Sequence, residues 1–428
     1  MKVLFVASEM TPLAKIGGLG DVIGSLPQAL KRLGVDARVI LPYYEAIHSQ
    51  KIKARKLFEL DDGTIIYEVA QNFGAQIYLV QNAEHLSRGP IYADASAFVG
   101  SESEIERFAF FSQKVFEVLQ DKRFFQPDIV HCNDWHTGLL VRLVRERRLS
   151  QKTIFTIHNL ANQGISKGKN LMEEGIVGSD LVSTVSPTYA KEILTKEYGS
   201  GLEKVLQKRN RQKKLTGILN GIDYGFWPSY ARDKAGLQRS LKLRVGEHLP
   251  IFAVVSRLTY QKGINLVIPL VKELVKKYGA QFVFLGRGED RYEKQLKDLA
   301  IKYPKSLFVK IAFDENLAHK IYPNSDFFLM PSLFEPCGLG QMVAMRYGTI
   351  PIVRSTGGLK DSVNSGKTGF VFKQSDAGSL NRAIRRALKI FDDRDKLAKM
   401  RGLCMQQDFS WDTSAAQYKK LYGGLIKS

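Results

Sequence analysis

Short apolar runs alternate with helical patterns along most of this chain. Apolar residues recur at helical spacing, for example, at residues 19–33 and 105–119. Apolar runs with the length of a buried strand lie between such stretches, and in the first half they occur at residues 3–7, 37–41, 129–132, 153–157, 181–185 and 215–219. Alternating strands and helices predict parallel sheets with right-handed crossovers.

Two stretches depart from this alternation. Residues 57–81 have the pattern of an antiparallel hairpin, with Asp62 and Gly63 as its turn. Residues 220–236 (NGIDYGFWPSYARDKAG) are rich in Gly, Pro and other turn-forming residues. Beyond them the alternation restarts, with predicted strands at residues 251–256, 282–285, 307–311, 327–330, 350–353 and 369–372.

The length of the chain supports a division at this break. A chain of 428 residues is too long for one typical core, and its 44% hydrophobic content is enough for two. We therefore predict an α/β protein of two Rossmann-like, doubly wound domains, residues 1–225 and 246–405, joined by a linker at 226–245. Ligands of such domains bind beyond the carboxyl ends of the strands, and two domains face to face would form a cleft.

The formal net charge of the chain is +20. Lys and Arg are spread over most of the sequence, and the densest groups, at residues 145–148 and 208–214, lie near predicted helix ends or a loop. We interpret them as solvated surface, although the same field would attract a phosphorylated substrate. No nucleic-acid-binding signature and no apolar run of membrane-spanning length accompanies the charge, so we expect neither nucleic acid nor membrane as a partner.

Cysteine usage and the N-terminus bear on the cellular compartment. The three cysteines, Cys132, Cys337 and Cys404, have no metal-type spacing and suggest no disulfide framework, which favours a reducing cytoplasm. The opening MKVLFVASEM is better explained as a buried first strand than as a signal peptide, because its apolar part ends at Ser8 and Glu9.

The segment from residue 326 to 348 (DFFLMPSLFEPCGLGQMVAMRYG) predicts a buried strand, a tight turn and a helix. Glu335 lies in the turn, beside the first N–H groups of the helix, which lack intrahelical partners and attract anions. A carboxylate next to such donors suits a ligand with hydroxyl and phosphate groups, such as a nucleotide sugar. An ordinary strand-to-helix turn explains the segment equally well.

Two further segments place cations next to turns. Lys15 precedes the turn GGLG (residues 17–20), whose N–H groups could approach an oxyanion, although the motif is weak by itself. In SRLTYQKGI, which follows a predicted strand, Arg257 and Lys262 flank a turn that enters a helix, as a pyrophosphate clamp requires. The alternatives are a structural glycine turn and solvated surface cations.

Polar clusters also follow two strands of the first half, at residues 131–136 (HCNDWH) and 156–159 (TIHN). The histidines His131, His136 and His158 invite comparison with a metal site. We discount this interpretation, because no HExxH motif or second carboxylate cluster accompanies them. Structural histidines with satisfied hydrogen bonds are the simpler explanation.

Taken together, these segments resemble the bacterial glycogen synthase and plant starch synthase family. The matching segments, in the family's order, are KIGGLGDV at residue 15, HCNDWHTG at 131, TIHNLANQG at 156, LNGID at 219, SRLTYQKG at 256, FEPCGL at 334 and STGGLKDSV at 355. The resemblance implies the GT-B fold with an active site in the interdomain cleft, and a final helix at residues 406–428 that packs back on the N-terminal domain. It also implies transfer of glucose from a nucleotide diphosphate to the non-reducing 4-hydroxyl of an α-1,4-glucan, with retention and without metal or cofactor.

The resemblance further assigns roles to residues at the motif positions. Arg257 and Lys262 would hold the distal phosphate and stabilise the departing diphosphate, and Lys15 would assist from the other domain. Glu335 and His158 would bind glucose hydroxyls, and the backbone carbonyl of His158 would face the positive anomeric centre. The other implied catalytic residue is Asp134, and the implied substrate-binding residues are Gly17, Gly18, Asp21, Tyr92, Asn159, Asn220, Cys337, Gly338, Leu339 and, against the nucleobase, Phe313.

The sequence departs from the family pattern at four places. The segment ISKGKNLMEEGI after Gln163 is much shorter than the family's loop, which borders the acceptor side, so acceptor size and processivity stay open. Gly340 stands in place of a common Thr, and Asn162 and Phe313 stand in place of common Tyr residues.

We therefore expect an α-1,4-glucan synthase that uses ADP-glucose, in the cytoplasm or, for a plant-type protein, in the plastid stroma. One alternative keeps the fold but changes the donor to UDP-glucose or the acceptor to a non-glucan. Another is a weakly catalytic paralogue that binds glucan or primes its synthesis. Covalent retention needs two carboxylates about 5 Å apart, and no partner of this kind is evident for Glu335, which favours front-face attack on the donor.

Overall fold

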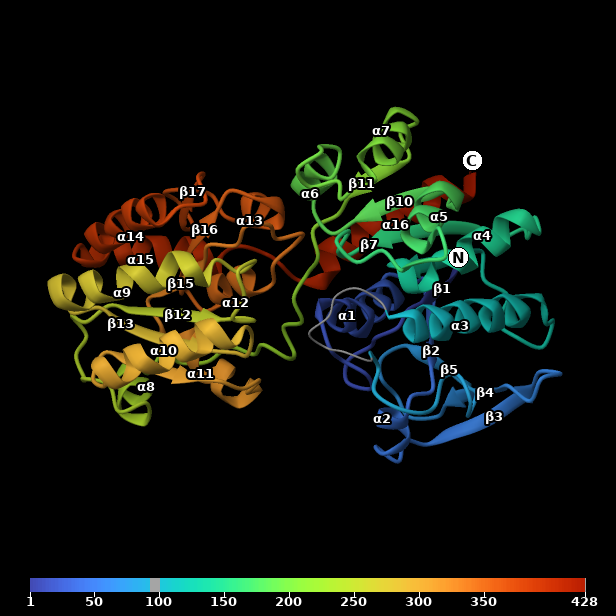
Figure 1. Cartoon of the computed structure of the whole chain (residues 1–428), viewed down its shortest axis with the longest axis horizontal. Helices are drawn as coiled ribbons and strands as arrows, with labels where there is room; N and C mark the ends of the chain where they lie inside the picture. Colours follow the sequence, from blue (N-terminus) through green and yellow to red (C-terminus); the bar gives the residue numbers. More distant parts are fainter. Residues whose placement is uncertain (93–100, 428) are drawn as a thin grey trace. The chain divides into compact units, whose positions relative to one another are not determined.

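The structure is a computed structural model that describes residues 1–92 and 101–427. The chain divides into two compact units, Met1–Gly221 with Ser410–Ser428, and Ile222–Phe409 (Figure 1). No helix within the described ranges is both long and apolar enough to cross a lipid bilayer. Each unit is an α/β fold, as the alternation of apolar runs and helical patterns predicts.

The first unit is built on a nine-stranded sheet with the order β11-β10-β7-β6-β1-β2-β5-β4-β3. Its strands are β1 (Lys2–Val6), β2 (Asp36–Pro42), β3 (Ala54–Glu59), β4 (Ile65–Val69), β5 (Gln76–Gln81), β6 (Ile129–Asn133), β7 (Lys152–Ile157), β10 (Leu181–Thr184) and β11 (Leu215–Gly217). The strands from β11 to β5 pair in parallel, whereas β3 and β4 pair antiparallel. The predicted hairpin is confirmed, and Gly63, at φ +79°, lies in its turn.

Helices follow the strands of this sheet along the chain, and one more helix comes from the C-terminal segment. They are α1 (Gly18–Arg32), α2 (Glu45–His48), α3 (Glu102–Gln120), α4 (Gly138–Glu146), α5 (Leu171–Gly178), α6 (Pro187–Glu192), α7 (Glu203–Arg211) and α16 (Trp411–Lys427). The last helix, α16, packs against α1, although nearly the whole chain separates them in sequence. Tyr422 of α16 is fully buried, and its hydroxyl lies 2.8 Å from the ring of His131 on β6. Residues 410–427 therefore belong to the core of the first unit.

The second unit contains a six-stranded parallel sheet with the order β14-β13-β12-β15-β16-β17. Its strands are β12 (Ile251–Val255), β13 (Gln281–Leu285), β14 (Leu307–Lys310), β15 (Phe327–Met330), β16 (Ile350–Arg354) and β17 (Phe370–Phe372). The rings of Phe252, Phe282 and Phe327 stack side by side across the three central strands. Helices cover the sheet on both faces (Figure 1), which explains why its central strands are continuous apolar runs.

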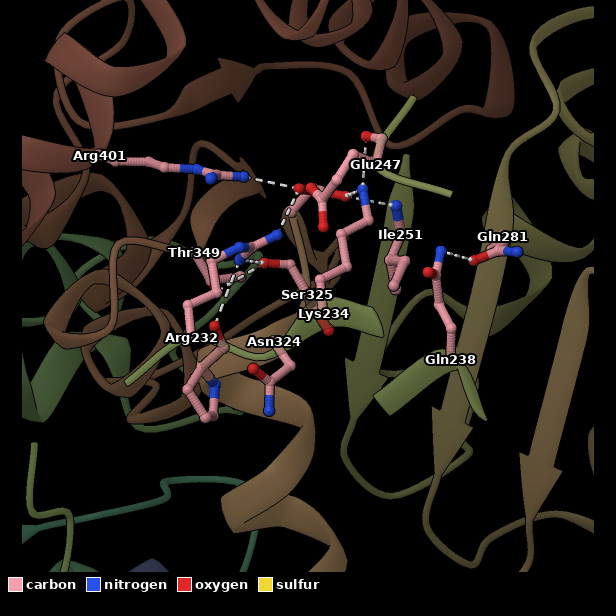
Figure 2. Close-up of polar contacts among 12 residues, drawn as sticks. Arg232, Lys234, Gln238, Glu247, Ile251, Gln281, Asn324, Ser325, Thr349 and Arg401 are labelled. Atoms are coloured by element: carbon pink, nitrogen blue, oxygen red, sulfur yellow. Dashed lines mark hydrogen bonds and ion pairs between the residues drawn. The ribbon is translucent and has the colours of Figure 1, made fainter. Parts of the chain in front are cut away.

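The helices of the second unit are α8 (Lys234–Ser240), α9 (Ile264–Tyr278), α10 (Asp290–Lys302), α11 (Glu315–Asn324), α12 (Gly340–Arg346), α13 (Gly357–Ser362), α14 (Ala377–Phe391) and α15 (Arg394–Met405). The residues expected as a linker, 226–245, lie within this unit. Arg232 and Lys234 of that segment form ion pairs with Asp326, at 2.6 and 2.8 Å, just before β15 (Figure 2). Asp326 is 1% exposed and also pairs with Arg401 of α15. This cluster fixes α8 and α15 to the amino-terminal edge of the sheet.

Strand order reverses once in each main sheet. The chain leaves β1 toward β2 on one side and later returns to β6 on the other side of β1. In the second unit it leaves β12 toward β13 and returns to β15 on the other side of β12. Ligands of doubly wound folds bind at such switch points, beyond the carboxyl ends of the strands. The candidate segments that follow β1, β6, β12 and β15 therefore lie at the ligand-binding edge of their own unit.

Candidate active site

The second unit joins two of the predicted residues directly. The ammonium of Lys262, from the turn after β12, lies 2.6 Å from the carboxylate of Glu335, from the turn after β15. The hydroxyl of Ser332 donates to the same carboxylate oxygen at 2.9 Å. The Lys262 and Glu335 side chains are only 16% and 9% exposed, so the pair is shielded from bulk water. A carboxylate held by these two contacts has a fixed orientation.

Arg257 completes this group. Its guanidinium donates to Gln261 Oε1 at 3.1 Å, and Gln261 in turn donates to the carbonyl of Phe334, at 3.3 Å. Burial lowers the pKa of Arg257, while the negative charge of Glu335 acts in the opposite direction. The two predicted cations and the predicted carboxylate therefore lie together at the β12/β15 switch point.

Close backbone packing holds the Glu335 turn in place. Gly263, at φ +71°, leaves no room for a Cβ atom, which would lie 2.2 Å from the carbonyl oxygen of Pro331. Gly357, at φ +42°, approaches the turn from α13, and a Cβ there would lie 1.9 Å from the carbonyl oxygen of Glu335. Only glycine allows both approaches. The glycines of SRLTYQKG and STGGLKDSV therefore allow the close backbone packing that holds the Glu335 turn.

The predicted backbone donors of this turn are oriented by a residue that sequence reasoning missed. Gln341 is fully buried, and its amide donates to the carbonyls of Cys337, at 3.3 Å, and Gly338, at 2.8 Å. Because the C=O and N–H of one peptide plane point in opposite directions, the N–H groups of Gly338 and Leu339 point away from Gln341. The sequence signal that could have identified Gln341 is its position as a polar residue among the apolar residues of the first turn of α12.

Phe313 lies apart from these contacts. It follows β14, and its side chain is 76% exposed. The structure therefore places it at the carboxyl-terminal edge of the same sheet but does not bring it into contact with the Lys262–Glu335 pair.

In the first unit, Asp134 follows β6, and its side chain binds the backbone of the segment that follows the neighbouring strand, β7. Its carboxylate accepts hydrogen bonds from the N–H of His158 at 2.7 Å and of Asn159 at 3.4 Å. Burial raises the pKa of Asp134 to about 7, although these two bonds oppose the shift. The residue has a backbone φ of +56°, which is unusual outside glycine and is found at functional sites.

The orientation of His158 follows from its partner. The amide nitrogen of Asn133 donates to the carbonyls of Val6 and His131, both at 3.1 Å, so its Oδ1 must be an acceptor. This oxygen lies 3.0 Å from His158 Nε2, which therefore carries the proton. Burial lowers the pKa of His158 to about 3, although part of the residue stays exposed. The ring is neutral at neutral pH, and its Nδ1 is an acceptor with no partner among the described residues.

The other two histidines, His131 and His136, contact other side chains of the first unit. His131 is bonded through one nitrogen to Tyr422 and through the other to Thr156 Oγ1, at 2.6 Å. His136 stacks on the ring of Trp135, with the ring centroids 4.2 Å apart. Within residues 1–92 and 101–427, no group of three or more His, Cys, Asp or Glu side chains could hold a metal ion.

From the sequence we expect the N–H groups of the glycine-rich turn after β1, including that of Gly17, to bind the ligand, and the structure differs at Gly17. The N–H groups of Ile16 and Gly17 donate to Glu9 Oε2, at 2.8 and 2.7 Å. The N–H of Gly17 is therefore already bonded within the protein, and the amides available for a ligand begin at Gly18, the first residue of α1. Lys15 forms an ion pair with Asp21 at 2.8 Å. Sequence reasoning treated Glu9 only as the end of an apolar run and missed this bond.

Two other predicted residues lie in the first unit. Tyr92 donates to Glu9 Oε1 at 2.8 Å, so it joins the glycine-rich turn through that carboxylate. Asn220 is buried, and its Oδ1 has no hydrogen-bond partner among the described residues.

The shortened segment after Gln163 is a minimal hairpin. Strands β8 (Ile165–Ser166) and β9 (Lys169–Asn170) pair antiparallel around Lys167 and Gly168, whose φ angles are +50° and +76°. Positive φ at both central positions is typical of a type I′ turn.

Comparison with known proteins places these motifs in a family. Residues 2–208 match the starch synthase catalytic domain, and residues 240–401 match the glycosyl transferases group 1 family. The glycogen synthase of Geotalea uraniireducens (strain Rf4) is 40% identical over 482 aligned positions, which cover 99% of this chain and 98% of the relative. The glycogen synthase of Geobacillus thermodenitrificans (strain NG80-2) is 40% identical over 491 positions, with coverage of 100% and 98%.

A solved structure agrees with the sequence relatives. The catalytic domain of starch synthase IV from Arabidopsis thaliana, determined with ADP and acarbose, matches with a TM-score of 0.87 and 31% identity, over 100% of this chain and 99% of that one. The alignments with the two glycogen synthases are longer than the 428 residues of this chain, so those relatives contain segments that it lacks. The chain belongs to the glycogen synthase and starch synthase family of glycosyltransferases, which have the GT-B fold.

Proposed function

We propose that this protein extends an α-1,4-glucan by transferring glucose from ADP-glucose to the non-reducing 4-hydroxyl, with retention of configuration. The observation that carries the proposal is the Lys262–Glu335 pair, with Arg257 beside it, at the switch point of the second unit. The starch synthase IV structure contains ADP, which supports an adenine nucleotide as donor.

The cations of the second unit suit the leaving group. The diphosphate gains negative charge as the glycosyl–phosphate bond breaks, so Arg257 and Lys262 would stabilise the transition state more than the ground state. Glu335 would accept hydrogen bonds from glucose hydroxyls, because Lys262 and Ser332 hold its carboxylate in one orientation. The N–H groups of Gly338 and Leu339, turned outward by Gln341, would donate to sugar or phosphate oxygens.

The first unit supplies an acceptor and a second carboxyl group. We infer that His158 Nδ1 accepts a hydrogen bond from a glucose hydroxyl, since its Nε2 proton is used by Asn133. Asp134 holds the N–H groups of His158 and Asn159 and so fixes the carbonyl that would face the anomeric centre. Lys15 and the first N–H groups of α1 would help to bind the phosphate groups of the donor.

Retention is assigned to front-face attack. A covalent intermediate needs a free carboxylate nucleophile with a partner carboxyl group about 5 Å away. Glu335 instead accepts from Lys262 and Ser332, which lowers its nucleophilicity. We infer that the leaving phosphate takes the proton of the acceptor hydroxyl while that hydroxyl attacks from the same face.

The test is incubation with ADP-glucose and a maltooligosaccharide. We expect release of ADP together with an oligosaccharide series lengthened by one glucose at a time and sensitive to an enzyme that cleaves α-1,4 bonds. UDP-glucose in parallel reactions determines the donor. Absence of ADP release at saturating donor would contradict the proposal.

A second candidate function follows from the β8–β9 hairpin. This minimal turn replaces the longer family loop that was expected to border the acceptor side, so a glucan-binding paralogue with weak turnover is the competing proposal. Glucan binding that persists in Glu335→Ala, with no donor-dependent extension in the parent protein, would favour it.

A further inference from the structure

Glu9 occupies a place in the first unit where an anion would otherwise bind. It follows β1 by three residues and is 4% exposed. Its Oε2 accepts the N–H groups of Ile16 and Gly17, at 2.8 and 2.7 Å. Two convergent N–H groups of a turn form a concave anion site. The protein fills this site with its own carboxylate.

The other oxygen of Glu9 binds a second candidate residue. Oε1 accepts the hydroxyl of Tyr92 at 2.8 Å, and that hydroxyl also lies 2.9 Å from Ser8 Oγ. One buried carboxylate therefore ties the glycine-rich turn to Tyr92, more than 80 residues further along the chain. A solvated surface glutamate would not make three such contacts.

The packing around Glu9 leaves no slack. A Cβ atom on Gly20 would lie 3.2 Å from Glu9 Oε2 and 3.3 Å from Lys15 Cγ. Because Gly20 has no side chain, the first turn of α1 can pack closely against the Glu9 carboxylate and against the aliphatic part of the Lys15 side chain. The position of the Lys15 backbone depends on the hydrogen bonds that Glu9 accepts from Ile16 and Gly17, the two residues after Lys15.

We propose that Glu9 is a positioning residue for donor binding: its carboxylate fixes the turn that carries Lys15 and, at the same time, the ring of Tyr92. This inference rests on the proposed function for its kinetic consequence, but the geometry of the turn can be measured without any substrate. Glu9 would touch neither phosphate nor glucose and would act through Lys15 and Tyr92.

The first experiment is hydrogen–deuterium exchange by mass spectrometry on the unliganded, full-length protein. Glu9→Ala removes the acceptor of two amides, so the peptide that contains residues 15–20 should exchange at least about tenfold faster, while peptides of the second unit stay unchanged. Glu84→Ala is the matched control, since the Glu84 side chain is 85% exposed. Unchanged exchange at residues 15–20 in Glu9→Ala would overturn the proposal, whatever reaction the protein catalyses.

The second experiment is a kinetic double-mutant cycle. If Glu9 acts through the turn, Glu9→Ala should lower kcat/KM for ADP-glucose about 10²-fold by misplacing Lys15. The loss in Glu9→Ala with Lys15→Ala should then be close to that of Lys15→Ala alone. Independent, multiplicative losses would overturn the proposal. An inactive parent protein would instead reject the proposed function and leave the exchange result as the decision on Glu9.

Conservative variants separate positioning from folding. Glu9→Gln keeps one oxygen for the two N–H groups and an amide that can donate to Tyr92, so it should retain activity within about tenfold of the parent. Glu9→Asp keeps the charge but is one methylene shorter and cannot reach both partners, so it should resemble Glu9→Ala in exchange and in kinetics. If Glu9→Ala does not fold, the same two measurements on Glu9→Asp decide, and parent-like values there would reject the proposal.

Discussion

Lys262 and Glu335 are 73 residues apart in sequence, yet the Lys262 ammonium lies 2.6 Å from the Glu335 carboxylate. Each residue belongs to a turn at the carboxyl end of a strand, and the two strands, β12 and β15, are neighbours in the sheet. The pair therefore exists because the chain crosses over the sheet between them. Its consequence is a cation and a carboxylate that share one shielded position at the ligand-binding edge.

Removal of the Lys262 ammonium should affect catalysis far more than folding. Lys262→Ala is expected to lower kcat by about 10²–10³-fold, the usual cost of one contact that stabilises transition-state charge. The matched control is Lys272→Ala on α9, where the side chain is exposed. An activity equal to that of Lys272→Ala, or loss of cooperative unfolding, would contradict a catalytic role.

The stability of the protein should depend on pH through Asp134. Its folded pKa is raised to about 7, so between about pH 4 and 7 the folded state holds a proton that the unfolded state has lost. This contribution to stability is present at low pH and is lost as pH rises. The buried histidines His131 and His136, with pKa lowered to about 3, act in the opposite direction, and acid weakens folding below about pH 6.5.

The variant Asp134→Asn isolates the carboxyl group. Its free energy of unfolding should rise with pH more steeply than that of the parent protein, by about 1.4 kcal/mol per pH unit between pH 5 and 6. Urea unfolding at several pH values measures the slopes. Equal slopes in parent and variant would mean that Asp134 is ionised throughout this range.

The Thr that the family resemblance leads us to expect at position 340 should not fit this chain. A Cβ on Gly340 would lie 2.9 Å from Cε1 of Phe328, so Gly340→Thr is expected to destabilise the protein by about 1–3 kcal/mol. Phe328→Leu in the same chain should relieve part of this cost, giving a double variant more stable than the sum of the two changes predicts. Thermal unfolding measures the effect.

A matched glycine provides the control for that series. Gly402 lies within α15, and a Cβ there would meet no atom within 4 Å. Gly402→Ala should therefore stabilise the protein by about 0.5–1 kcal/mol, since alanine favours a helix. A destabilised Gly402→Ala, or a neutral Gly340→Thr, would contradict the packing argument.

The Asp326 cluster should be a major source of stability in the second unit. Asp326→Asn would leave Arg232, Lys234 and Arg401 without their shared carboxylate (Figure 2), and loss of one partner of a buried ion pair typically costs about 3–5 kcal/mol. Glu273→Gln, which breaks the exposed Arg385–Glu273 pair, should cost at most about 1 kcal/mol. Similar unfolding midpoints for the two variants would refute the distinction.

The sequence by itself determined the secondary structure, the α/β class and the placing of chemistry at strand ends. Period-two patterns, apolar runs and turn residues report local conformation, which is why the hairpin around Gly63 and the strand–turn–helix at Glu335 were predictable. The motif residues after β1, β6, β12 and β15 were visible for the same reason.

Only the tertiary structure decided which of those residues share a position. The contacts of Glu9 with Tyr92, of His131 with Tyr422 and of Gly340 with Phe328 join segments that fold together through sheet order and helix packing, and no local pattern encodes them. A buried carboxylate such as Glu9 looks like any polar residue at the end of a strand until its hydrogen-bond partners are known. Burial also raises the pKa of Asp134 and lowers that of His158, and the extent of burial depends on the whole fold.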